Sequence, residues 1–83
     1  MKELTNIILS SIKALRFSLL EEFINENDDI KSLEMLSEVL KDKVKTTLLL
    51  TTFKSYEDVY VGSSFEEDAE KAISVLTNHL KTF

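Results

Sequence analysis

The chain has 83 residues, of which 43% are hydrophobic and 30% are charged, a balance that is typical of one folded domain over residues 1–83. It has no cysteine and a single histidine, so disulfides are excluded and neither a structural metal nor a cofactor is expected. The formal net charge of −5 disfavours contact with nucleic acid and with anionic membranes.

The first predicted element is a long helix over residues 2–25. Four of its apolar residues fall outside the main apolar stripe, so the apolar arc is wider than the roughly 100° that a surface helix needs. Such a helix lies either at the centre of its own domain or between its own core and a partner, and we favour the partner. The main stripe consists of Leu4, Ile7, Ile8, Ile12, Leu15, Leu19 and Phe23, and the four further residues are Leu9, Phe17, Leu20 and Ile24.

The same segment lacks the pattern of a signal peptide. Its apolar run, Ile7 to Leu9, is short, and Lys13 and Arg16 follow where a cleavage site would lie. No stretch of about 18 apolar residues could cross a membrane, so no membrane contact is expected. Together with the absence of cysteine, these features predict a cytoplasmic location.

The second predicted element is an amphipathic helix from Asp29 to Asp42. The acidic, asparagine-rich stretch at residues 25–29 is suited to a turn and to the N-cap of this helix. It lacks the alternating ligands and the central glycine of a calcium loop, so no metal site is expected there. The apolar positions recur at steps of three and four and are Ile30, Leu33, Leu36, Val39 and Leu40.

A short antiparallel β-hairpin is predicted next, with strands at residues 45–53 and 58–61. β-Branched residues are dense in the first of these segments and favour a strand over a helix. A polar stretch separates the two segments, and Gly62 closes the second. A helix over residues 44–54 is the competing interpretation. Its apolar positions at near-helical spacing are Val44, Leu48, Leu49, Phe53 and Tyr56.

The predicted hairpin is a second indication of self-association. Two strands make only a marginal sheet, and an exposed edge rich in leucine invites pairing with another chain. Since the wide first helix and this edge both lack cover, we expect a homodimer. The predicted self-association surface consists of Leu9, Phe17, Leu20, Ile24, Leu48 and Leu50.

The last predicted element is a helix that begins with a capping box of Ser64 and Glu67 and has acidic residues in its first turn. The whole order therefore predicts an α+β fold with two N-terminal helices, a hairpin and a C-terminal helix (ααββα). The alternative is an all-α four-helix domain. The apolar stripe of the last helix consists of Phe65, Ala69, Ala72, Ile73, Leu76, Leu80 and Phe83.

The sequence predicts no catalytic site. His79 lies near the end of the last helix, no serine lies in a nucleophile elbow, and neighbouring carboxylates diverge on a helix. We therefore expect a non-enzymatic interaction or regulatory protein that binds itself and another protein.

A DNA-binding regulator is the first alternative. It would use a helix-turn-helix-like segment over residues 30–54, with a basic patch of Lys41, Lys43 and Lys45. Against it, the helix that would enter the groove offers no arginine, asparagine or glutamine to address base edges. Nucleic acid is therefore not the favoured partner.

An acidic inhibitor that imitates nucleic acid is the second alternative. It requires that the acidic residues of the last helix converge on one face with the acidic stretch at residues 21–29. The candidate partner patch consists of Glu66, Glu67, Asp68 and Glu70.

Overall fold

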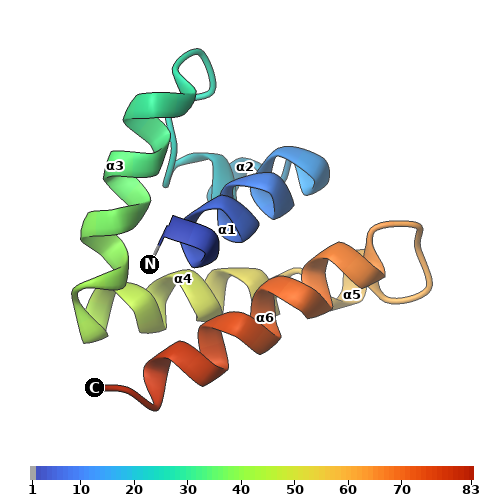
Figure 1. Ribbon diagram of the computed structural model, residues 1–83. Helices are drawn as coiled ribbons and strands as arrows, with labels where there is room; N and C mark the ends of the chain where they lie inside the picture. The colour runs from blue at the N-terminus through green and yellow to red at the C-terminus, as the bar shows by residue number, and fades with distance from the viewer. Residues whose placement is uncertain (1) are drawn as a thin grey trace.

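The computed structural model describes residues 2–83 and, within them, contains six helices and no strand (Figure 1). The predicted ααββα order is therefore wrong, and the all-α alternative gives the correct class. No helix in this part of the chain is long and apolar enough to span a bilayer. Four helices are long and two consist of a single turn. They are α1 (Lys2–Leu15), α2 (Ser18–Glu21), α3 (Asp29–Leu40), α4 (Lys43–Ser55), α5 (Glu57–Tyr60) and α6 (Glu66–Leu80).

The segment predicted as the first strand forms α4 instead. Asp42 caps this helix, because its Oδ1 accepts a hydrogen bond of 3.1 Å from the backbone N–H of Lys45. The threonine hydroxyls donate to helix carbonyl oxygens, as Thr47 does to Lys43 at 2.8 Å. Helical spacing then brings the buried residues to one face, and these are Thr46, Leu49, Leu50 and Phe53.

The segment predicted as the second strand lies in α5 and the turn that follows it. The N–H of Tyr60 donates to the carbonyl oxygen of Tyr56 at 3.0 Å, which is a helical bond. Gly62 has a φ of 81°, and this left-handed conformation lets the chain reverse toward α6. The leucine-rich strand edge from which self-association was partly predicted is therefore not present in residues 2–83.

The helix predicted over residues 2–25 is interrupted at Arg16. This residue has a left-handed φ of 56°, and its N–H donates to the carbonyl oxygen of Ile12 at 2.8 Å. Phe17, which follows, stacks on Tyr56 with the ring centroids 4.2 Å apart. This contact ends α1 and leads the chain into the separate short helix α2.

The helices predicted from Asp29 and near the C-terminus are confirmed as α3 and α6. Asp28 caps α3 by accepting a hydrogen bond of 3.0 Å from the N–H of Lys31. The predicted capping box of α6 does not form. Instead, α6 begins after Phe65, whose N–H donates to Ser63 Oγ at 3.1 Å.

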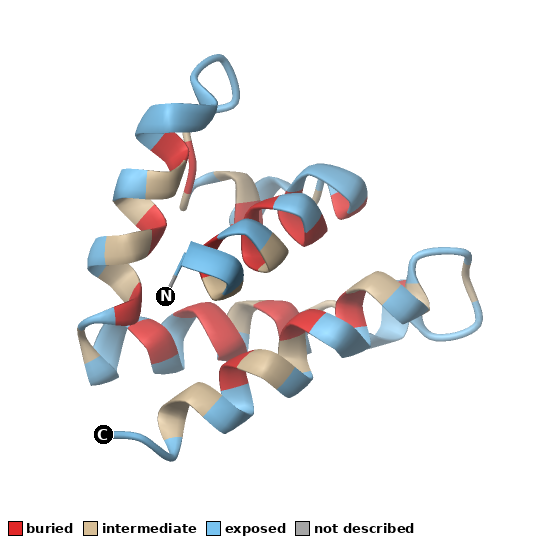
Figure 2. Cartoon of the chain, in the orientation of Figure 1, coloured by how far each residue is buried: buried red, intermediate tan, exposed pale blue. Residues whose placement is uncertain are grey.

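The four long helices form a closed ring of contacts, in which α1 packs on α3 and α6, and α4 packs on the same two helices. In Figure 1, α4 and α6 run side by side below α1, and α3 stands at one end of the group. Figure 2 shows that the buried residues lie where these helices face one another. The largest fully buried apolar side chains are Phe53, Ile8, Ile12, Leu20, Leu36, Leu40, Leu49 and Leu76.

Candidate functional site

Most of the predicted self-association surface lies in the core of the chain itself. Leu9, Leu20, Ile24 and Leu50 are all buried, and Phe17 is half-buried against Tyr56. The wide apolar arc of the first segment is thus accounted for by packing within one copy, since the break at residue 16 turns α2 toward the core. Leu48 differs from these five residues, because 57% of its surface is exposed.

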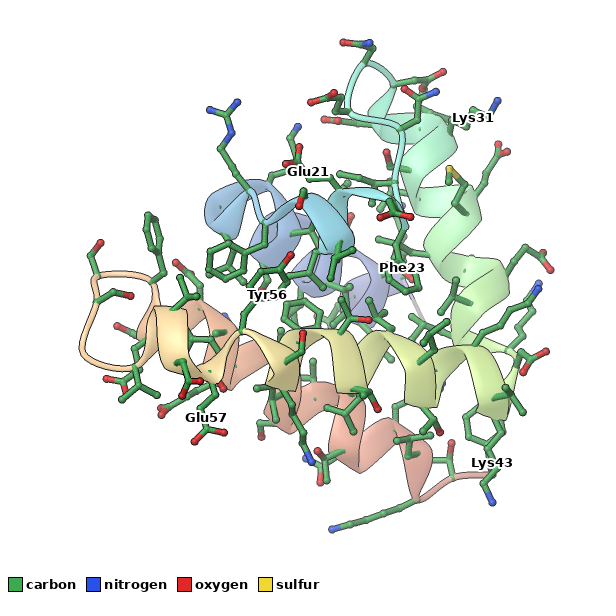
Figure 3. All side chains as sticks on the ribbon, turned by 180° about the vertical axis from the view of Figure 1, so that it is seen from behind. Glu21, Phe23, Lys31, Lys43, Tyr56 and Glu57 are labelled. Carbon is green, nitrogen blue, oxygen red and sulfur yellow. The ribbon has the colours of Figure 1, made fainter. Side chains whose placement is uncertain are left out.

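Leu48 lies on the outer face of α4, beside α2. Together with Leu19, Glu22, Phe23 and Thr52 it lines an open groove of about 350 Å³, here called the α2–α4 groove. Leu19 is 51% exposed, so two leucines from helices far apart in the sequence present apolar surface to the same groove. Figure 3 shows Phe23 directed from the α2 side toward α4. Clustered exposed apolar side chains of this kind are typical of a binding surface.

Tyr56 fixes the position of α2 relative to α4. Its hydroxyl oxygen accepts a hydrogen bond of 3.1 Å from the backbone N–H of Leu19, in the first turn of α2. Its ring also stacks on Phe17, which in turn meets Phe65 edge to face at a centroid distance of 6.5 Å. Phe17, at the N-cap of α2, has no side-chain acceptor for the first N–H groups of the helix, and the Tyr56 hydroxyl takes this role. Tyr56 thereby holds Leu19 near Leu48.

The outer face of α4 is cationic as well as apolar. Val44, one turn before Leu48, is 77% exposed. The exposed lysines are Lys43, Lys45 and Lys54, and α4 contains no acidic residue. We call these five residues the α4 face. It contrasts with the rest of the chain, whose net charge is negative.

The predicted basic patch is brought together at the junction of α3 and α4. Lys41, Lys43 and Lys45 are all exposed there, on either side of the capping residue Asp42. Lys41 is engaged in an exposed ion pair of 3.4 Å with Glu38, which reduces the local positive potential. The patch therefore has two lysines without a carboxylate partner.

The predicted acidic patch is only partly assembled. Burial, followed in magnitude by the charges of Glu57, Glu70 and Glu66, raises the pKa of Tyr60, so these carboxylates gather near one phenol. Asp68 instead lines a groove between α6 and α1. Figure 1 also shows the acidic α2–α3 loop well separated from the start of α6. The convergence that imitation of nucleic acid requires is therefore not observed.

His79, the single histidine of the chain, has a structural position at the end of α6. His79 Nε2 lies 2.6 Å from the carbonyl oxygen of Leu40 and must donate to it, because a carbonyl only accepts. Its ring meets Phe83 edge to face, so it joins the ends of α6 and α3. No group of three or more histidines and carboxylates in this part of the chain is placed to hold a metal ion.

A second groove, of about 630 Å³, lies between α1 and α3. Ile30 is its most exposed apolar residue, and Leu33 lies beside it. Two carboxylates, Glu34 and Glu38, and one lysine line the same groove. This groove is acidic, whereas the α4 face is basic. A substitution at Ile30 can therefore serve as a control for a substitution at Leu48.

Comparisons with known proteins add no information about these surfaces. No family model matches the chain, and no match was found among the curated proteins or the solved structures. The proposed function therefore rests on the geometry and charge of the chain.

Proposed function

We propose that the chain is a non-enzymatic protein-binding module that engages its partner through the α4 face and the α2–α4 groove. The observation that supports this function is the exposure of Leu19 and Leu48 in the same groove. Single exposed leucines are common on protein surfaces, but two that meet from separate helices form a patch. Burial of such a side chain by a partner contributes about 1.5–3 kcal/mol.

The position of the groove also supports binding of a protein. Its walls are helices of the packed core: α4 contacts α3 and α6, and α2 is held by Tyr56. A preformed apolar surface on rigid elements loses little conformational entropy when a partner helix or loop enters it. The lysines around it would form the polar rim that such interfaces have.

Site-specific photo-crosslinking tests this function. A benzophenone amino acid replaces Leu48 in the chain, which is then expressed and irradiated in the organism that encodes it. We expect one defined adduct, identified by mass spectrometry as this chain or another protein. The control carries the same group in place of Ile30. An absence of adducts from the first position, or the same adducts from both positions, would contradict the proposal.

DNA binding is the second candidate function, because α3 and α4 are joined by only Lys41 and Asp42 and lysines lie at the start of α4. A helix-turn-helix likewise joins two helices by a short turn, although usually one of about three to four residues, and places the second helix in the major groove. The exposed side chains of α4 are otherwise threonine, serine, valine and leucine, which offer few donors to base edges. The overall negative charge also opposes it.

Fluorescence anisotropy at low salt distinguishes the two functions. If α4 bound DNA, the wild-type chain would raise the anisotropy of labelled genomic duplexes, and the double variant Lys43→Glu/Lys45→Glu would not. Under the protein-binding proposal neither chain changes the anisotropy. Salt-dependent binding lost only in the double variant would favour the DNA-binding function.

A further inference from the structure

Helices α4 and α5 together form one continuous surface, here called the α4–α5 rod (residues 43–60). Tyr56 separates the two helices, and Phe53 of α4 and Tyr60 of α5, on either side of it, are both buried. The face that α4 turns to the core is therefore continued by α5. The opposite, outward face of the rod carries three exposed aliphatic side chains, which are Val44, Leu48 and Val59.

Charge on the rod is divided between its two ends. Lys43 and Lys45 lie at the start of α4, and Glu57 and Asp58 lie at the start of α5, with all four side chains exposed. A third exposed lysine, Lys54, lines a groove with Glu57 and partly offsets the negative charge of that end. At a rise of about 1.5 Å per residue, the two ends are about 20 Å apart. Figure 3 shows Lys43 and Glu57 at opposite ends of the rod and pointing to the same side of it. Each end thus complements the other, but the two are too far apart to pair within one copy.

We propose that the partner of the α4 face is a second copy of this chain, packed antiparallel along the α4–α5 rod about a two-fold axis near Thr51. This inference rests on the function proposed above and identifies its partner. A two-fold contact uses the same surface on both subunits, so a surface with opposite charges at its two ends is complementary to itself when reversed. In this arrangement Val44 lies opposite Val59 of the second copy.

The side on which the charges lie is also consistent with this symmetry. A two-fold axis perpendicular to the plane of two antiparallel rods leaves each side chain on its own side of that plane. Since Lys43 and Glu57 point to the same side, Lys43 of one copy meets Glu57 of the second copy, and the reverse pair forms by symmetry. The α2–α4 grooves, which flank the middle of α4, meet one another across the axis.

The affinity and the orientation of this dimer have separate physical origins. A standard interface buries about 800 Å² per partner, which is about 15% of the 5196 Å² surface of this chain. The apolar residues Leu19, Leu48, Val44 and Val59 supply most of the affinity. Exposed ion pairs add little free energy but disfavour the parallel arrangement, in which like charges would meet.

Sedimentation equilibrium of the purified chain, at micromolar to millimolar concentrations and low salt, tests the proposal. We expect a monomer–dimer equilibrium for the wild type. Leu48→Glu should raise the dissociation constant at least about tenfold. Ile30→Glu, which changes a more exposed apolar residue in the groove between α1 and α3, should leave it unchanged. Circular dichroism verifies that each variant is folded.

A charge exchange tests the antiparallel register. Lys43→Glu and Glu57→Lys should each raise the dissociation constant on the order of tenfold, because two like-charge pairs form in each dimer. The double variant Lys43→Glu/Glu57→Lys should return to within about threefold of the wild type, since the pairs are restored with reversed sign. Because Lys43 and Glu57 are exposed, neither substitution alters the packing of the core.

The outcomes separate this proposal from the function on which it rests. A wild type that remains monomeric at all concentrations overturns the second copy as partner, and crosslinking from position 48 to a different protein would then still support the binding function. A dimer that is dissociated by Ile30→Glu and not by Leu48→Glu overturns the assignment of the interface. A dimer in which the charge exchange gives no recovery overturns the antiparallel arrangement.

Discussion

Ser32 holds the α2–α3 loop against α3. Its side chain is fully buried, and its Oγ accepts a hydrogen bond of 2.9 Å from the N–H of Asn25. The same oxygen lies 2.7 Å from the carbonyl of Asn25 and 3.0 Å from that of Asp28, so its one proton always has an acceptor. A single small side chain therefore satisfies backbone groups where this otherwise exposed loop meets α3.

Ser32→Ala is expected to lower the free energy of unfolding by about 1–3 kcal/mol, because the part-buried N–H of Asn25 loses its acceptor. Urea denaturation followed by circular dichroism measures this change. Ser10→Ala, at an exposed position of α1, is the matched control and should change stability by less than about 0.5 kcal/mol. Equal effects at the two positions would show that the hydrogen bonds of Ser32 contribute nothing.

Arg16 and Gly62 share a left-handed backbone but differ in their side chains. Arg16→Gly is expected to raise the free energy of unfolding by about 0.5–1 kcal/mol, because glycine adopts a φ of 56° without steric cost. Gly62→Ala should lower it by about 1 kcal/mol, and since a Cβ there would meet no atom within 4 Å, the loss belongs to the backbone alone. Thermal denaturation compares both variants with the wild type. A loss of stability in Arg16→Gly would reveal a contact of the guanidinium group that outweighs the strain.

At the scale of the element, α4 depends on its cap. Asp42→Ala should lower the free energy of unfolding by about 1 kcal/mol, because the N–H of Lys45 loses its acceptor. Asp42→Asn keeps a side-chain oxygen at the cap and should retain most of the stability. Chemical denaturation of the two variants separates the hydrogen bond from the charge. If Asp42→Asn were as unstable as Asp42→Ala, the negative charge next to the helix dipole would be responsible instead.

The sequence predicts the helices whose apolar spacing is regular and fails where propensity and tertiary packing disagree. α3 and α6 follow their patterns. In α4, the β-branched residues favour a strand, but Thr46 is fully buried and donates to the carbonyl oxygen of Val39 on α3 at 2.8 Å. This tertiary hydrogen bond, together with the cap at Asp42, stabilises the helix that local propensity alone does not indicate.

The candidate site was predicted only at Leu48 and the lysines. Leu50, predicted to share a face with it on a strand, points into the core because two residues along a helix correspond to about 200°. Leu19 was counted in the stripe of a continuous first helix, and no glycine or proline marks the break at Arg16 that turns it outward. The groove therefore depends on a stack between Phe17 and Tyr56, which lie far apart in the sequence and cannot be paired from spacing.

At the scale of the whole molecule, negative charge is concentrated where α5 meets α6, at the end of the rod opposite Lys43 and Lys45. Burial, followed by the charges of Glu57, Glu70 and Glu66, raises the pKa of Tyr60, so the ionised phenol is disfavoured in the folded state. Below the ordinary value of 10.0 the phenol is neutral in both states and stability does not depend on it. Above that value the phenol of Tyr60 loses its proton in the unfolded chain at a lower pH than in the folded chain, which favours unfolding.

Stability should therefore fall with rising pH above about 10, and Tyr60→Phe should remove the part of this fall that belongs to the phenol. The limiting slope for one proton is about 1.4 kcal/mol per pH unit, and it ends once the raised pKa of the folded state is passed. Urea unfolding of both chains on either side of this pH measures the difference, which isolates the contribution of the Tyr60 phenol. A difference between the two chains that did not change with pH would mean that neither burial nor the surrounding carboxylates penalise the phenolate. Because Glu57 belongs both to this cluster and to the predicted pair with Lys43 of a second copy, Glu57→Lys should reduce the alkaline loss in the monomer as well as weaken the dimer.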